Sequence, residues 1–402
     1  MRIAMVSEHA DPLGAVGGVD AGGQNVHVAA LAAHLASRGH EVTVFTRRDD
    51  AAVATRLRAP DGYLVEHVPA GPPSEVPKDE LWPFMADFAR YLAARWAAER
   101  PDVVHAHFWM SGAAATSAAG PLDIPVVQTF HALGTVKRRY QGAHDTSPLA
   151  RTSVERELCR TVDHVIATCS DEVAELRRTG LPRAKVSVVP CGVDVARFTP
   201  APHPGDGKQR LVVVGRLVER KGVADVVDAM AEVPGVELLV VGGPARDSLA
   251  LDPEVQRLRR RAAAAGSLQR IEFFGRVCHD SLPAVFALAD VVVAVPWYEP
   301  FGIVPLEAMA CGRPVVGSAV GGLLDTILPG VTGELIPARR SDLLAVTLRD
   351  LPADGRRRAA YGAAGVHRAH QHYRWEQVAA ETEDVYTRVV ESVSAPAAEA
   401  LR

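Results

Sequence analysis

Short apolar runs alternate along the chain with longer segments whose apolar side chains recur at helical spacing. Residues 2–6 are typical of a buried strand, and residues 23–37 place Leu31 and Leu35 on one helical face before a stop signal at Gly39. Further strands are predicted at residues 41–46, 62–68, 102–107, 125–130, 164–168 and 185–189. Further helices are predicted at about 80–98, 147–160 and 170–178, the last with Ser170 as its N-cap. This alternation favours a parallel sheet covered on both faces.

A turn-rich segment then interrupts the pattern. Residues 200–207 read Pro-Ala-Pro-His-Pro-Gly-Asp-Gly, a composition typical of a linker. Beyond it, strands are predicted at residues 211–214, 236–241, 270–274, 291–295 and 314–316, and helices at about 223–232, 252–264, 281–289, 342–351, 353–371 and 375–393. The chain is therefore predicted to be α/β, with two doubly wound domains at 1–200 and 208–374 and a cleft between them. Ligands bind such sheets at the carboxyl ends of the strands, so candidate chemistry is sought there.

Composition narrows the class of protein. The 402 residues are 48% hydrophobic and 23% charged, which excludes disordered, collagen-like and disulfide-scaffold proteins. A net charge of −4 offers no electrostatic footprint for nucleic acid. The five cysteines form no Cys-x-x-Cys pair, which argues against a zinc site and favours a reducing compartment. With no signal-peptide core and no run of about 18 apolar residues, we expect a cytoplasmic protein without a membrane span.

The strongest local motif directly follows a predicted strand. In the segment Trp-Tyr-Glu-Pro-Phe-Gly-Ile-Val-Pro-Leu-Glu, Glu299 and Glu307 bracket a turn at Gly302 that opens a helix. The backbone N–H groups of Phe301, Gly302 and Ile303 would lie at the positive helix N-terminus, which suits an anion or hydroxyl groups. A single glutamate here is more often a solvated surface residue. Two glutamates that bracket a glycine turn favour a binding site.

Two other segments could bind anionic groups. Gly215 frees the backbone after a predicted strand, and Arg216 and Lys221 place two cations on the loop that follows. In the N-terminal half, Gly22 and Gly23 open a helix and allow a phosphate or sugar to approach the backbone closely. In isolation, the two cations would more often be solvated surface residues.

These motifs together resemble a known family. The Glu299-x7-Glu307 spacing, followed by Ala-Met-Ala-Cys-Gly-Arg-Pro-Val-Val and Val-Gly-Gly-Leu, resembles the retaining glycosyltransferases of family 4, which have the GT-B fold. The similarity extends from Ile3 to about Trp375, and the N-terminal glycine segment is most similar to the group of inositol-phosphate glycosyltransferases and sucrose synthases. The resemblance implies two Rossmann-like domains, with the helix at about 375–394 packed back onto the first. It also implies a nucleotide-sugar donor and a small-molecule acceptor.

The resemblance assigns roles to individual residues. It makes His131 and Glu299 the catalytic residues that contact the donor sugar. The donor-binding residues that it implies are Gly23, Arg216, Lys221, Val277, Phe301, Gly302, Ile303 and Glu307. The acceptor-binding residues that it implies are His9, Asp20, Gly22, Gln24, Asn25 and Lys78. Because no Asp-x-Asp pair occurs, we expect no metal and no other cofactor, with two cations neutralising the leaving diphosphate.

Several alternatives stay open. A uridine diphosphate sugar is favoured as donor over guanosine diphosphate mannose, and the acceptor could be a polyol, a sugar or a sugar phosphate. Phe108 and Ala132 stand where the inositol-phosphate enzymes have Tyr and Thr, which argues against that acceptor. A non-catalytic sugar-nucleotide-binding protein would share the same residues. A nicotinamide dehydrogenase should show Gly-x-Gly-x-x-Gly after a strand, which neither half does. A homodimer is compatible with the sequence.

Overall fold

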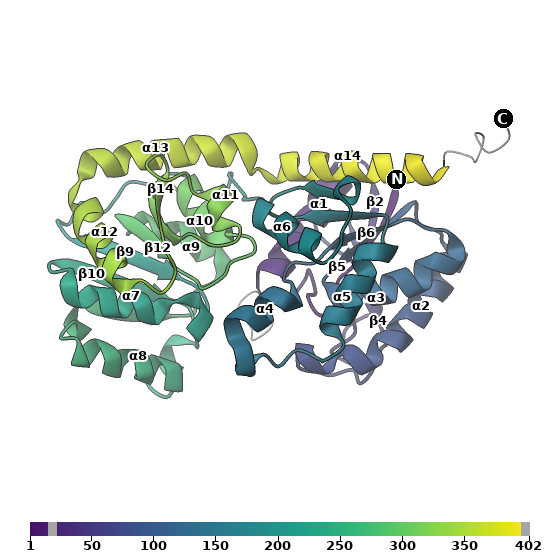
Figure 1. The fold of residues 1–402 in the computed structure, drawn as a ribbon, viewed down its shortest axis with the longest axis horizontal. Coiled ribbons are helices and arrows are strands. Elements are labelled where there is room, and N and C mark those ends of the chain that lie inside the picture. The colour runs from purple at the N-terminus through teal and green to yellow at the C-terminus, as the bar shows by residue number, and fades with distance from the viewer. Residues whose placement is uncertain (15–21, 395–402) are drawn as a thin grey trace. The chain divides into compact units, whose positions relative to one another are not determined.

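The computed structural model describes residues 1–14 and 22–394, which form two α/β units (Figure 1). The first unit comprises residues 1–190 and the C-terminal segment that begins at Trp375, and the second comprises residues 191–374. This division lies about ten residues before the predicted boundary at 200. The reason is that Phe198 packs on Phe286, with ring centroids 6.2 Å apart, so the segment after Pro190 contributes to the second core.

The first unit contains an eight-stranded sheet in the order β3-β4-β2-β1-β5-β6-β7-β8, parallel except for β3. Its strands are β1 (Arg2–Val6), β2 (Glu41–Arg47), β3 (Arg56–Arg58), β4 (Leu64–Val68), β5 (Val103–His107), β6 (Val126–Thr129), β7 (His164–Ala167) and β8 (Val186–Val188). Its helices are α1 (Gly23–Ser37), α2 (Met85–Ala98), α3 (Trp109–Ala119), α4 (Gly134–Gln141), α5 (Arg151–Thr161), α6 (Ser170–Arg178) and α14 (Trp375–Ser394). Helix α14 packs against α1, so the C-terminal helix belongs to this unit (Figure 1).

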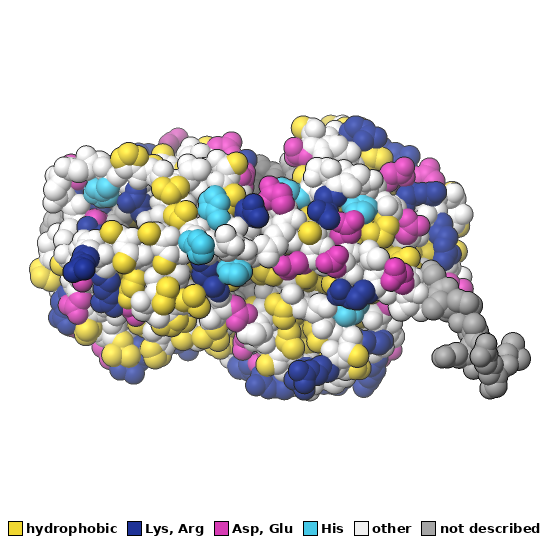
Figure 2. All heavy atoms as spheres, turned by 90° about the horizontal axis from the view of Figure 1, so that it is seen from above, with side chains coloured by type: hydrophobic (Ala, Val, Ile, Leu, Met, Phe, Trp, Pro, Cys, Tyr) yellow, Lys and Arg dark blue, Asp and Glu magenta, His cyan; other side chains and the backbone are white. Residues whose placement is uncertain are grey.

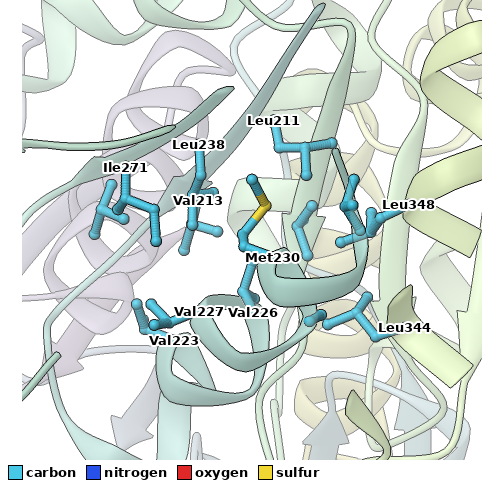
Figure 3. Packing of buried hydrophobic residues seen from close by; sticks show 14 of the residues in the cluster. Leu211, Val213, Val223, Val226, Val227, Met230, Leu238, Ile271, Leu344 and Leu348 are labelled. Carbon is cyan, nitrogen blue, oxygen red and sulfur yellow. The ribbon is translucent and has the colours of Figure 1, made fainter. Parts of the chain in front are cut away.

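The second unit contains a six-stranded, fully parallel sheet in the order β11-β10-β9-β12-β13-β14. Its strands are β9 (Gln209–Val214), β10 (Val236–Val241), β11 (Ile271–Gly275), β12 (Val291–Ala294), β13 (Val315–Ser318) and β14 (Gly333–Ile336). Its helices are α7 (Val223–Ala229), α8 (Pro253–Ala264), α9 (Leu282–Ala287), α10 (Ile303–Ala310), α11 (Leu323–Thr326), α12 (Ser341–Ala353) and α13 (Gly355–His372). Figure 3 shows strand residues such as Leu238 packing with Met230 and with Leu348 of α12 in one buried cluster.

The strand order reverses once in each sheet, between β1 and β5 and between β9 and β12. Right-handed crossovers therefore place the helices on opposite faces to either side of the reversal, and the loops after the two central strands diverge. The gap that this leaves at the carboxyl ends is where doubly wound sheets bind ligands. Each unit therefore has its own switch point, the place at which the strand order reverses.

Several local predictions needed correction. Helix α2 begins at Met85 and not near residue 80, because short 3₁₀ turns that include Pro83 precede it. The N-cap of α6 is Cys169 and not Ser170, since the Cys169 sulfur accepts a hydrogen bond from the Glu172 N–H at 3.4 Å. Five elements were not predicted: β3, β14, α3, α4 and α11. Helix α3 has small or apolar residues on nearly all sides, so it lacks the amphipathic period that reveals a helix.

The described surface carries charges of both signs. In the face shown in Figure 2, basic and acidic side chains are interspersed and no large patch of a single sign stands out. Among residues 1–14 and 22–394, no helix combines the length and apolarity needed to cross a membrane.

Candidate active site

The predicted site residues divide between the two units. His9, Gly22, Gly23, Gln24, Asn25, Lys78 and His131 lie in the first unit. Arg216, Lys221, Val277, Glu299, Phe301, Gly302, Ile303 and Glu307 lie in the second. Asp20 lies outside the described residues. Nearly all of those described follow the carboxyl end of a strand or begin a helix there.

In the second unit, the loops that follow β9 and β12 are held against each other. The Trp297 N–H donates to the Arg220 carbonyl oxygen at 2.8 Å. Gly222 has a φ of +70°, and a Cβ atom there would lie 2.0 Å from the Val295 carbonyl oxygen. Only glycine permits this approach, because any side chain would push the two loops apart. The contact brings the β9 loop, with its cations, beside the loop that carries the first glutamate.

Lys221 and Glu299 form an ion pair across these loops. The Lys221 ammonium donates to the Glu299 carboxylate, and the two side chains are only 26% and 15% exposed. Burial raises the pKa of Glu299, but the charge and hydrogen bond of Lys221, with help from Arg220, outweigh it and the pKa is lowered overall. Arg216 is half-buried on the same β9 loop. The switch point therefore combines an ionised carboxylate with a cluster of basic side chains.

Helix α10 begins beside this pair, with Gly302 as its N-cap. The Gly322 N–H donates to the Glu299 carbonyl oxygen at 2.8 Å. A Cβ atom on Gly321, whose φ is +50°, would lie 2.2 Å from the same oxygen. Gly321 and Gly322 therefore allow the loop after β12 to pack closely against the loop after β13. This fixes the turn that aims the first N–H groups of α10, including that of Ile303, at the switch point.

Glu307 is part of a hydrogen-bonded chain that the sequence did not reveal. It is 3% exposed, and its Oε1 lies 2.6 Å from Nε2 of His279. Arg197 lies 3.0 Å from the other ring nitrogen, Nδ1, and a guanidinium can only donate. Nδ1 must therefore accept, and Nε2–H must donate to Glu307. Burial raises the pKa of Glu307 overall, although the hydrogen bond from His279 opposes the shift. Val277, a predicted donor-binding residue, is half-buried on the same segment after β11 as His279.

In the first unit, a buried carboxylate lies at the switch point between β1 and β5. Glu8 is 1% exposed and accepts a hydrogen bond from Nδ1 of His9 at 2.7 Å. Its other oxygen bonds the Ser111 hydroxyl, and that hydroxyl accepts from the Glu8 N–H at 3.0 Å. The His9 ring meets Phe108 edge to face, with centroids 4.9 Å apart. Among these, only His9 was predicted as a site residue, and Glu8 carried no motif that singled it out.

The N-terminus of α1 is closed by its own side chains. Asn25 is buried, its Oδ1 accepts from the Gly22 N–H at 3.0 Å, and its Nδ2 donates to the Asp11 carbonyl oxygen at 2.9 Å. Gln24 donates to the Ser7 hydroxyl at 3.2 Å. The Asn25 amide thus joins the start of the helix to the Asp11 backbone after β1. The composition of the segment does not distinguish this capping arrangement from ligand binding.

Two cationic side chains lie over the Phe108 ring. The Lys78 nitrogen lies 5.7 Å from the ring centroid and the Arg151 guanidinium carbon 5.0 Å from it. Phe108 also has a φ of +83°, a rare and strained conformation for a bulky residue. Strain of this kind persists only where surrounding contacts impose it, and it concentrates at functional sites.

His131 belongs to a buried cluster of four histidines. Its Nε2 lies 2.8 Å from Nδ1 of His107, and its ring centroid lies 5.1 Å from that of His27. His105 bonds the hydroxyl of Tyr386 on α14 at 2.6 Å. Burial lowers the pKa of every member, to about 4 for His27 and about 3 for His105, so the cluster is neutral at pH 7. In the described part of the chain, no three His, Cys, Asp or Glu side chains could hold a metal ion.

A buried ion pair supports the loop that carries His131. Arg151 and Glu155 lie one helical turn apart on α5 and are bonded at 2.8 Å. Arg151 also donates to the Ala132 carbonyl oxygen at 2.5 Å, and the Glu155 carboxylate accepts from the Gly134 N–H at 2.9 Å. The two charges thus secure the backbone on both sides of the turn after β6. His131 itself has a φ of +61°, so this turn is held in an uncommon conformation.

Comparison with known proteins identifies family models, relatives and solved structures that are similar to this chain. Residues 21–197 match the family model for Glycosyltransferase Family 4, and residues 197–368 match that for Glycosyl transferases group 1. A D-inositol 3-phosphate glycosyltransferase from Streptomyces avermitilis is 34% identical, over 97% of this chain and 88% of the relative. One from Kineococcus radiotolerans is 35% identical, over 98% and 97%. Sucrose-phosphate synthase from Thermosynechococcus elongatus superimposes with a TM-score of 0.89 at 30% identity, over 98% of this chain and all of the other. Anabaena HepE, solved in complex with UDP-glucose, has a TM-score of 0.72 at 20% identity, over 96% of this chain and all of the other.

Proposed function

Since the chain belongs to glycosyltransferase family 4, we propose that it transfers a sugar from a uridine diphosphate sugar to a small polar acceptor with retention of anomeric configuration. It is a glycosyltransferase and has the GT-B fold. The observation that carries the proposal is the Lys221–Glu299 pair beside Arg216, at the switch point where α10 begins. A basic loop, an ionised carboxylate and a helix N-terminus suit a sugar diphosphate.

In this proposal, the second unit holds the donor. Arg216 and Lys221 bind the diphosphate, whose negative charge grows as the bond from the sugar C1 to the phosphate oxygen breaks. Glu299 accepts hydrogen bonds from the sugar hydroxyls once Lys221 turns to the phosphate. Glu307 is buried and already accepts one hydrogen bond, from His279, so it suits the ribose hydroxyls.

The chemical step needs no base from the protein. The acceptor oxygen forms its bond to C1 on the face from which the nucleoside diphosphate leaves, and its proton passes to the departing phosphate oxygen. His131, held by His107, contacts the donor sugar as a neutral hydrogen-bonding group. The protein contributes position and charge stabilisation, which can supply most of the rate enhancement.

The donor base and the acceptor are inferred from similar proteins. The HepE structure was solved with UDP-glucose, which favours uridine diphosphate over guanosine diphosphate mannose. The curated relatives act on D-inositol 3-phosphate by name, which supports a polyol, sugar or sugar phosphate. Phe108 and Ala132 lack the hydroxyl groups found in that branch, so the acceptor need not be the same. Cytoplasmic location and homodimer formation stay predictions.

A donor-by-acceptor screen with product masses tests the proposal. Purified protein is incubated with UDP-glucose, UDP-N-acetylglucosamine and GDP-mannose, each with myo-inositol, its 3-phosphate, fructose and fructose 6-phosphate. We expect a UDP-sugar to give a product, and the Glu299→Gln variant, which keeps the side-chain shape, to give far less. Binding of UDP-sugars without transfer to any acceptor and without slow donor hydrolysis would instead indicate a non-catalytic binding protein.

Acceptor binding is tested separately through Lys78. The Lys78→Ala variant should raise the acceptor KM about tenfold, as loss of one charged hydrogen bond does, and leave UDP affinity unchanged. Calorimetry with UDP provides the second measurement. A parallel loss of UDP affinity would move Lys78 to the donor site.

A further inference from the structure

We propose that Glu8 positions His9 so that its Nε2 atom accepts a hydrogen bond from an acceptor hydroxyl, and that this selects an uncharged hydroxyl over a phosphate at that point. The inference rests on the proposed function, because it concerns the acceptor of the same reaction. Glu8 was not among the predicted residues, and it is more deeply buried than any predicted acceptor contact that the structure describes.

The position of the pair favours contact with a ligand. Glu8 and His9 follow β1, and Ser111 lies in the first turn of α3, which follows β5. These are the two strands between which the sheet order reverses, so the pair lies at the switch point of the first unit. Burial of an unneeded carboxylate here would be costly, since an ionised group loses its hydration.

The hydrogen bonds of Glu8 determine which tautomer His9 adopts. An ionised carboxylate only accepts, and here one oxygen accepts from His9 Nδ1 at 2.7 Å while the other accepts from the Ser111 hydroxyl. When the imidazole is neutral, its proton is therefore on Nδ1, and Nε2 has a lone pair. Edge-to-face packing on Phe108 at 4.9 Å holds the plane of the ring. Within the described residues, no donor or acceptor bonds Nε2.

An Nε2 lone pair discriminates between acceptor groups. A hydroxyl can donate its hydrogen to it, whereas a phosphate oxygen at pH 8 offers only lone pairs and is repelled. The Phe108 ring beside His9 offers no hydrogen-bond donor, and the Lys78 and Arg151 cations lie over that ring, 5.7 and 5.0 Å from its centroid. The structure therefore assigns a sugar or polyol hydroxyl to the His9 position. A phosphate elsewhere on the acceptor would have to bind another group, such as Lys78.

Nitrogen NMR tests the tautomer without any ligand. Protein labelled with 15N-histidine is recorded at pH 8, and the His9 signals are identified by their loss in His9→Gln. We expect the Nδ1–H tautomer in the wild type and in Glu8→Gln, whose amide oxygen still accepts, and mainly Nε2–H in Glu8→Leu. An Nε2–H tautomer or a doubly protonated ring in the wild type would overturn the proposal. This result stands even if Glu8→Leu does not fold, or if no transfer reaction is found.

Kinetics test the consequence for the acceptor. With the best UDP-sugar, the acceptor KM is measured for myo-inositol and fructose and for their phosphates. We expect Glu8→Leu to raise the acceptor KM about tenfold, to keep the donor KM, and to be rescued in Glu8→Gln. The control is Glu383→Leu, which removes the carboxylate 3.1 Å from His40 and should change neither constant. A rise in the donor KM, or equal losses in Glu8→Gln and Glu8→Leu, would contradict a positioning role.

Discussion

Replacement of Lys221 by methionine removes the ammonium that neutralises Glu299 but keeps most of the side-chain volume. Glu299 would then be a largely buried carboxylate without its main partner, since the pair is 26% and 15% exposed in the two side chains. Loss of one partner of a fully buried pair costs about 3–5 kcal/mol, and loss of an exposed pair costs roughly 0–1 kcal/mol. Because the pair is partly solvated, we expect a loss of about 2 kcal/mol in the free energy of unfolding at pH 7.

The loss should depend on pH in a defined direction. In the wild type, Lys221 holds the pKa of Glu299 below its ordinary value of 4.5, so the pair stabilises the fold above that pH and the contribution is lost as the pH falls through the folded-state pKa. In Lys221→Met, only the weaker effects of Arg220 and of the hydrogen bond from the Phe301 backbone oppose burial, and we expect the pKa of Glu299 to rise above 4.5. The variant therefore loses stability as the pH rises from 4.5 through the raised pKa. The difference between the two proteins should be largest at pH 7 and should shrink as the pH falls through the folded-state pKa of Glu299 in each protein.

Urea unfolding at pH 7 and pH 4 measures this difference. The control is the same substitution in a Glu299→Gln background, where no charge is left unpaired and the loss should fall below about 1 kcal/mol. An equal loss at both pH values would refute the reasoning, as would an equal loss in both backgrounds. Lys221 would then stabilise the loop through packing, and not through charge.

Three further outcomes follow from the site. Activity should survive excess EDTA while Arg216→Ala lowers kcat roughly 10²-fold, as loss of one preorganised charge donor does; restoration by Mn²⁺ after EDTA would contradict this. Glu307→Gln should weaken UDP binding about tenfold or more in calorimetry, because a charged acceptor is lost, and unchanged affinity would remove Glu307 from the donor site. Arg151→Met should cost about 3–5 kcal/mol by leaving Glu155 buried and unpaired, and Arg151→Met/Glu155→Leu should recover most of that loss; no recovery would show that Arg151 acts through its other contacts.

The local pattern of apolar and polar residues was sufficient to predict most of the helices and strands. Helix α1 and strands β1 and β10 were predicted at their observed bounds, because their apolar runs and stop signals lie within a few residues of one another. Prediction was wrong or absent where the local signal was weak. Helix α3 is buried on nearly every side and shows no amphipathic period, and β14 is only four residues long.

The sequence by itself determined the class of fold, the family, and the motifs that follow the strands, since these depend on residue type and on short spacings. The tertiary structure alone decided which partner each functional side chain has. Glu307 meets His279 from 28 positions away, and Glu8 meets Ser111 from 103 positions away. No local signal marks such pairs, because the order in which the strands assemble decides which loops become neighbours. Tautomer and charge state follow from those neighbours, so they too are properties of the folded chain.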